Sequence, residues 1–145
     1  MKAKFLVALT CLAVLAGLHS TLGAAQAPTK SVQHGVYTAD QAKRGQPLYD
    51  DNCSPCHTSM LVGGEMAPPL TGGQFYSNWT DLTVGDIFER MRTSMPANAP
   101  GSLKGQQYAD ILAYVLSVAK FPAGAAEIAP DMEALKQIKF QAPKQ

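Results

Sequence analysis

The run Cys53-Ser54-Pro55-Cys56-His57 decides how this chain of 145 residues is organised. Residues three and four apart share one face of a helix, so the two cysteines and His57 can all reach a single object. A C-x-x-C-H run is typical of the attachment site of a covalently bound c-type haem. The two thiols would form thioethers with the vinyl groups of the porphyrin, and the imidazole would bind the iron as its proximal ligand.

Two other interpretations of the cysteine pair are open. Cysteines this close together in an exported protein can form a short-loop disulfide. They can also form a thiol redox pair, but that motif normally lies in a strand-helix setting, which the sequence lacks. Haem attachment is the favoured interpretation, because His57 follows Cys56 directly.

The first 25 residues have the three-part order of a secretory signal peptide. Residues 1–4 are basic, residues 5–18 are uncharged and mostly apolar, and small residues lead to Gly23-Ala24-Ala25. The apolar run has 14 residues, whereas a membrane-spanning helix needs about 18 or more. We therefore predict export to the periplasm with cleavage after Ala25. An uncleaved membrane anchor is the alternative.

Charge and cysteine content exclude several classes of partner. Removal of Lys2 and Lys4 with the signal peptide leaves 10 Lys and Arg against 11 Asp and Glu, a net charge of −1. Such a chain has no basic surface for nucleic acid or anionic membranes. We expect no nucleic-acid partner and no stable membrane association after signal cleavage.

Loss of Cys11 with the signal peptide leaves Cys53 and Cys56 as the cysteines of the mature chain.

Hydrophobic periodicity predicts an all-α fold with three to four helices. Apolar side chains recur at helical spacing in residues 39–52, in residues 84–94 and, most clearly, from Tyr108 to Ala119. Glycines and prolines make residues 58–74 a loop. No alternating strand pattern is present.

Two capping boxes mark the starts of the first two helices. Thr38 stands three residues before Gln41, and Thr83 stands three residues before Asp86. In each pair the hydroxyl and the partner side chain can satisfy amides of the first turn. The second helix ends by Ser94, because the residue before a proline is pushed out of the α region.

The chain divides into four segments. We expect a signal peptide over residues 1–25, a flexible leader over 26–36, a haem domain over 37–121 and a C-terminal tail over 122–145. Residues 132–138 of the tail have the spacing of a short helix, which could pack on the protein itself or on a partner. The helices alone make a marginal core for a domain of about 85 residues, so a large apolar cofactor would complete it.

The chain resembles the class I c-type cytochromes, the small monohaem family that includes mitochondrial cytochrome c. The resemblance covers about residues 36–121 and rests on four features that occur in the family's order. These are Gly45 with Tyr49, the run from Cys53 to His57, Ala67-Pro68-Pro69-Leu70 (similar to G-P-x-L) and Asp110-Ile111-Leu112-Ala113-Tyr114 (similar to D-L-I-A-Y).

The resemblance implies a cytochrome c fold wrapped around one covalently attached haem c. The first and last helices would cross closely, so that Gly45 and Tyr49 meet Ile111 and Tyr114. The carbonyl of Pro68 would accept the Nδ1 proton of the haem-binding histidine, which orients the ring.

Further roles toward the haem follow from the same resemblance. Leu70 would pack on the porphyrin, and Trp79 would bond a propionate, although a plain core tryptophan is an equal alternative. The family's axial methionine corresponds to Met95, because Ser94-Met95-Pro96 opens a loop between two helices. The metal ligands would then be His57 and Met95. A core Met95 with a five-coordinate iron is the alternative.

A haem iron with two protein ligands has no open position for substrate. We therefore expect a one-electron carrier and no enzyme, running between a periplasmic dehydrogenase or other donor and an oxidase or other acceptor. A monomer is expected. The alternatives are an electron-transfer subunit bound permanently to a larger dehydrogenase and a five-coordinate haem sensor or peroxidase. The family's ring of lysines around the haem edge is absent, so docking cannot be carried over from mitochondrial partners.

Overall fold

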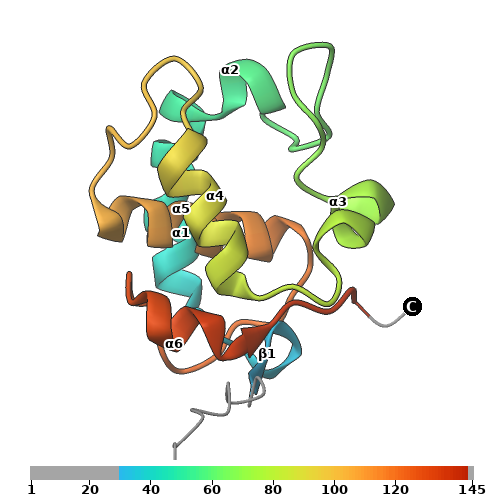
Figure 1. The fold of residues 1–145 in the computed structure, drawn as a ribbon, viewed down its shortest axis with the longest axis vertical. Helices are drawn as coiled ribbons and strands as arrows, with labels where there is room; N and C mark the ends of the chain where they lie inside the picture. The colour runs from blue at the N-terminus through green and yellow to red at the C-terminus, as the bar shows by residue number, and fades with distance from the viewer. Residues whose placement is uncertain (1–29, 144–145) are drawn as a thin grey trace, which may run out of the picture.

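The computed structural model describes residues 30–143 and confirms the all-α prediction apart from two very short strands (Figure 1). The expected signal peptide over residues 1–25 lies outside the described part of the chain. The elements in chain order are β1 (Lys30–Ser31), the 3-10 helix η1 (Val32–His34), α1 (Ala39–Asn52), α2 (Ser54–His57), α3 (Gly72–Trp79), α4 (Val84–Ser94), α5 (Gly105–Val118), α6 (Met132–Lys136) and β2 (Ile138–Lys139).

Helices α1 and α5 cross at the centre of the fold, and Gly45 sets how closely they approach. A Cβ atom at this position would overlap the carbonyl oxygen of Asp110 and come within 3.0 Å of Cβ of Tyr114. The rings of Tyr49 and Tyr114 also meet, with centroids 5.3 Å apart. The predicted crossing is present, but the backbone of Asp110, not Ile111, is the neighbour that Gly45 contacts most closely.

Helix α4 begins and ends where the sequence predicts. The Thr83 hydroxyl accepts from the backbone N–H of Asp86 at 3.2 Å, and the Asp86 carboxylate accepts from the N–H of Thr83 at 2.7 Å. The helix ends at Ser94, and Met95 adopts an extended conformation before Pro96. Its buried face packs on α5, where the rings of Phe88 and Tyr108 have centroids 6.4 Å apart.

The predicted capping box of α1 is only half present. The Thr38 hydroxyl accepts from the N–H of Gln41 at 3.1 Å. The Gln41 side chain, however, is fully buried and points away from the cap. It donates to the carbonyl of Ile128 and accepts from its N–H, both at 2.8 Å, and it also donates to Asp110 at 3.2 Å. Gln41 therefore joins α1, α5 and the C-terminal segment.

The expectation of a flexible leader over residues 26–36 is wrong for its described part. β1 pairs in parallel with β2, and Val32 has no exposed surface. Gly35 lies against Gly124, where a Cβ atom on either residue would meet the other's backbone. The polar sequence hides this packing, because a single buried valine gives no periodic signal.

The C-terminal segment is equally part of the core. Ile128, Leu135 and Phe140 are at most 2% exposed. Helix α6 is the short helix expected in this tail, and it packs on α4. The apolar side chains of the segment therefore cover the protein's own core, so residues 30–36 and 122–143 are continuous with the haem domain that was expected over 37–121.

The starts of α3 and α5 add two details. α3 begins at Gly72, inside the residues 58–74 that the sequence predicts to be a loop. At the start of α5 the Gln107 side chain accepts from the N–H of Lys104 at 2.9 Å. No helix within residues 30–143 is long and apolar enough to cross a membrane.

Candidate haem site

The end of α1 and the single turn of α2 place both cysteines and His57 together. Cys53 follows the last residue of α1 and its carbonyl accepts from the N–H of His57 at 2.9 Å. Pro55 lies in the first turn of α2, where a missing N–H removes no helical hydrogen bond. The turn is therefore closed between Cys53 and His57 and forms α2, which lies at the top of Figure 1.

His57 is held in one orientation. Its side chain is 7% exposed, and Nδ1 lies 2.8 Å from the carbonyl oxygen of Pro68. A carbonyl can only accept, so Nδ1 carries a proton, and in the neutral ring Nε2 is the nitrogen with the lone pair. This contact is the one that the family resemblance implies, and it leaves Nε2 available to a metal.

Both cysteines are free thiols and half-buried. Burial raises the pKa of the Cys53 thiol to about 11, so this group is neutral at physiological pH. A thiol redox pair needs a nucleophilic cysteine whose pKa is lowered. The environment of Cys53 therefore disfavours that interpretation and leaves two unpaired thiols beside an oriented imidazole, the donor set that covalent haem attachment requires.

The loop between α2 and α3 is fixed to the motif at several points. The N–H of Gly63 donates to the carbonyl of His57 at 3.2 Å, and Tyr49 donates its hydroxyl to the carbonyl of Thr58 at 2.8 Å. Gly63 has a positive φ of 73°, and a Cβ there would meet the Pro68–Pro69 backbone. Leu61, a residue of the same loop, is fully buried. These contacts place the Pro68 carbonyl over His57.

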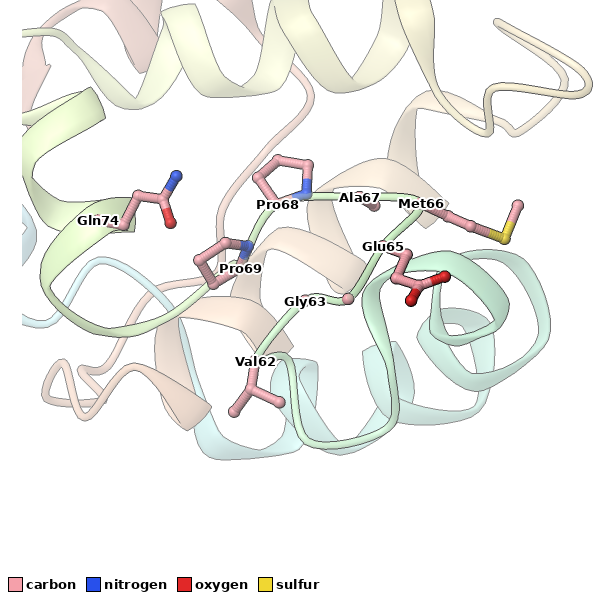
Figure 2. Close-up of a pocket in the computed structure, with 9 residues that line it drawn as sticks. Val62, Gly63, Glu65, Met66, Ala67, Pro68, Pro69 and Gln74 are labelled. Atoms are coloured by element: carbon pink, nitrogen blue, oxygen red, sulfur yellow. The ribbon is translucent and has the colours of Figure 1, made fainter.

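An open groove of about 540 Å³ lies along this loop (Figure 2). Its lining is mostly small or apolar and includes one carboxylate. The lining residues are Val62, Gly63, Gly64, Glu65, Met66, Ala67, Pro68, Pro69 and Gln74. The groove therefore shares Pro68 with the contact that orients His57.

Met95 is half-buried at the end of α4, and its backbone is anchored by α5. The Tyr108 hydroxyl, on a side chain only 1% exposed, donates to the Met95 carbonyl at 2.7 Å. Sequence reasoning assigned Tyr108 to the apolar stripe and missed this bond. The available signal was that a buried tyrosine hydroxyl needs a partner.

The structure brings some of the predicted site residues together and leaves others apart. His57 and Pro68 are in contact, Cys53 caps the turn of α2, and Cys56 lies within it. Leu70 and Trp79 are partly buried against the core, and the Trp79 ring lies beside Phe75 with centroids 6.5 Å apart. Iron ligation by Met95 and the haem contacts of Leu70 and Trp79 stay predictions.

The buried polar atoms include one without a partner near the motif. The hydroxyl of Thr58, the residue after His57, is buried and makes no hydrogen bond in the described chain. A buried polar atom is normally paired with protein, solvent or a bound group. This unsatisfied hydroxyl agrees with a site that holds a further group beside His57.

Comparison with known proteins supports this chemistry. Residues 40–115 match the family described as cytochrome c oxidase, cbb3-type, subunit III. No curated protein sequence matches the chain. The fold is similar to the crystal structure of the sulfane dehydrogenase SoxCD from Paracoccus pantotrophus, at 23% identity and a TM-score of 0.50, over 68% of this chain and 52% of that chain. The chain thus spans about half the length of that protein chain, and at this identity the similarity concerns the fold.

Proposed function

This chain belongs to the family of cytochrome c oxidase, cbb3-type, subunit III, and from that premise we propose that it carries single electrons on one haem c attached to Cys53 and Cys56. Membership of a c-type cytochrome family implies covalently bound haem. The observation that carries the proposal is the oriented imidazole of His57, with Nδ1 on the Pro68 carbonyl and two free thiols on the same turn.

The chain's own residues would hold and tune the group. Cys53 and Cys56 would supply the two thioether links, His57 the proximal nitrogen and Met95 the distal thioether, while Leu70 and Trp79 would line the ring. A bound haem supplies exchange of one electron between ferrous and ferric iron. The thioether of Met95 is a soft, neutral donor, so as a ligand it would favour the ferrous state and would raise the potential relative to two nitrogen ligands.

Two protein ligands leave no position for substrate, so the proposed role is transfer of electrons without a catalysed reaction. The hydrogen bond from Tyr108 holds the Met95 backbone, which supports a ligand that stays in place in both oxidation states. We propose that the carrier works in the periplasm after removal of residues 1–25. The haem domain over 37–121 would be enclosed by the packed segments on either side.

A second candidate is an electron-transfer subunit held permanently on a dehydrogenase. A solved structure with a similar fold is described as a sulfane dehydrogenase, which motivates that candidate. Against it, the apolar side chain of Leu135 in the C-terminal segment is buried in the protein's own core. Size-exclusion chromatography of the protein from its native periplasm separates the two, because a subunit would elute with a larger enzyme.

Optical spectra of the exported protein test the proposed function. We expect a c-type spectrum in both oxidation states, a sulfur-to-ferric-iron charge-transfer band and no binding of carbon monoxide. Met95→Ala should remove the band and admit carbon monoxide. Ready binding by the wild type would instead favour the five-coordinate sensor or peroxidase.

Covalent attachment is tested separately. The double variant Cys53→Ser with Cys56→Ser should yield protein whose haem is extracted by acidified solvent, whereas wild-type haem stays with the chain. Retention of haem by the double variant would refute the attachment.

A further inference from the structure

Exposed apolar side chains gather in one short stretch after α2. Of the four large hydrophobic residues exposed within residues 30–143, three lie between residues 60 and 66. Met60 is 70% exposed, Val62 is 56% exposed and Met66 is 79% exposed. An apolar cluster that a monomer leaves in water marks a site of interaction. Methionine suits such a site, because its flexible, polarisable side chain adapts to a partner's surface.

This stretch is connected directly to the proposed iron ligand. Val62, Met66 and Pro68 line the same groove, and in Figure 2 the Met66 side chain projects from the loop, away from Pro68. The Pro68 carbonyl lies 2.8 Å from Nδ1 of His57, and the N–H of Gly63 donates to the His57 carbonyl. A molecule bound in this groove would contact Pro68, and the carbonyl of Pro68 accepts the hydrogen bond of the His57 imidazole.

The charged residues nearest to the stretch in the sequence have one sign. Between Arg44 and Arg90 the chain holds six carboxylates and no lysine or arginine. Glu65 is the charged residue of the groove lining, and Asp50 and Asp51 are exposed just before the haem motif. A partner that approaches this side meets negative charge, so complementary charge on the partner is positive.

We propose that Met60, Val62 and Met66, with Glu65 at their edge, form the docking surface for a redox protein whose own surface has an apolar centre rimmed by lysine or arginine. This inference rests on the proposed function, since it names the partner of the same haem. The docking surface is negative and its partner positive, whereas a ring of lysines around a haem edge would require a negative partner. A second copy of the chain fits poorly, because it would bring a surface of the same negative charge to the contact.

A cationic redox reagent with an apolar surface serves as the probe. Tris(1,10-phenanthroline)cobalt(III) carries three positive charges and becomes cobalt(II) by taking one electron from the reduced protein. Ferricyanide, a polar anion that takes one electron in the same way, is the reference. Stopped-flow rates at low ionic strength are compared for wild type, for the double variant Val62→Ser with Met66→Ser, and for Glu65→Lys.

Two matched variants control for loss of any exposed apolar or acidic group. Leu82→Ser removes an apolar side chain that is 42% exposed between α3 and α4. Glu133→Lys reverses a charge on α6, at the opposite end of the molecule from α2 (Figure 1). We expect both loop variants to slow the cobalt reaction by about threefold or more, and the controls to change it by less than about 1.5-fold. Ferricyanide should not be slowed by either loop variant.

The outcomes separate the docking surface from the function. If reduced wild type passes electrons to both reagents but the loop variants behave like the controls, the docking surface is refuted and the carrier stands. If the wild type has no reducible haem, the carrier fails. In that case, amide shifts in nitrogen-15-labelled protein on addition of the cobalt complex decide whether the docking surface exists. Shifts centred on residues 60–69 uphold the docking surface, and shifts elsewhere refute it. A wild-type dimer in sedimentation that the double variant loses would assign the surface to a second copy.

Discussion

Two regions meet at the haem motif and are built in opposite ways. The α1–α5 crossing is closed by Gly45 and by the fully buried Gln41, with the facing sides of the two helices packed together. The loop over residues 58–71 carries its most prominent side chain, Met66, 79% exposed. The loop keeps its shape through a few backbone hydrogen bonds. The difference shows that the crossing positions the cysteines by packing, whereas the loop orients His57 by one carbonyl and leaves Met60, Val62 and Met66 exposed.

Removing the close approach at the crossing should have the largest effect. Gly45→Ala places a Cβ on the carbonyl oxygen of Asp110, so the free energy of unfolding should fall by about 3 kcal/mol or more. Gly73→Ala is the matched control, because a Cβ there meets nothing within 4 Å and should change stability by less than about 1 kcal/mol. Denaturant unfolding of both variants measures the difference. Equal stability of the two would mean that the helices do not cross this closely.

Loss of the buried side-chain amide of Gln41 should have the next largest effect on stability. Gln41→Leu removes three hydrogen bonds and leaves the peptide groups of Ile128 without their partner, which should cost about 2–3 kcal/mol. Gln46→Leu on the exposed face of the same helix is the control and should stay within about 0.5 kcal/mol. Hydrogen exchange at Ile128 should speed up in the first variant alone. Unchanged protection there would show that the C-terminal segment is held by its apolar side chains.

A smaller change tests whether the crossing also controls the Met95 loop. Tyr108→Phe loses the hydroxyl that donates to the Met95 carbonyl and should lower stability by about 1 kcal/mol. Tyr76→Phe loses a comparable bond, from its hydroxyl to the carbonyl of Ala119 at 2.9 Å, and serves as the control. Only Tyr108→Phe should also weaken the sulfur-to-iron charge-transfer band and alter the reduction potential. If both variants leave the band intact, Tyr108 is structural only.

The smallest expected effect is a dependence of folding stability on pH, caused by the ion pair between Arg44 of α1 and Glu127. Hydrogen bonds from Arg44 hold the pKa of Glu127 below its ordinary value of 4.5. The folded state therefore binds this proton less readily than the unfolded state. The stabilisation is complete above about pH 4.5 and is lost as the pH falls through the lowered pKa of the folded state. Glu127 is exposed, so the effect is small.

Unfolding measured between pH 3 and 6 checks this pH dependence. Glu127→Gln should flatten the fall in stability in acid, whereas Glu133→Gln on α6 should leave it as in wild type. If stability falls equally with pH in the two variants, the acid sensitivity does not come from Glu127.

Much of the fold could be predicted because its signals are local. The bounds of α1 and α4 follow from Thr38, Thr83 and the proline after Met95, and the apolar stripe of α5 is continuous. The C-x-x-C-H run is likewise local, because its five residues alone indicate covalent haem attachment. The resemblance to c-type cytochromes that it supports is confirmed by the family match.

The remainder depends on contacts between distant residues. The buried side chain of Gln41 finds Ile128, which lies 87 residues further along the chain. Val32 is buried directly after a strand of only two residues, which is too short to leave a pattern in the sequence. Tyr108 was placed in the core, but its hydroxyl partner is a backbone carbonyl, which has no sequence signature. Such pairings are decided by the packed fold and not by propensity or periodicity.

The parallel pairing of β1 with β2 has a practical consequence for handling the protein. Lys30 pairs beside Ile138 at the end of the molecule that holds α6, while α2 lies at the opposite end (Figure 1). A linker to an electrode, a bead or a second domain that is joined at Lys30 would leave the Cys53–His57 turn facing away from the support. The strand pairing would thereby fix the direction in which an immobilised protein presents its redox centre, whatever the chemistry of the support.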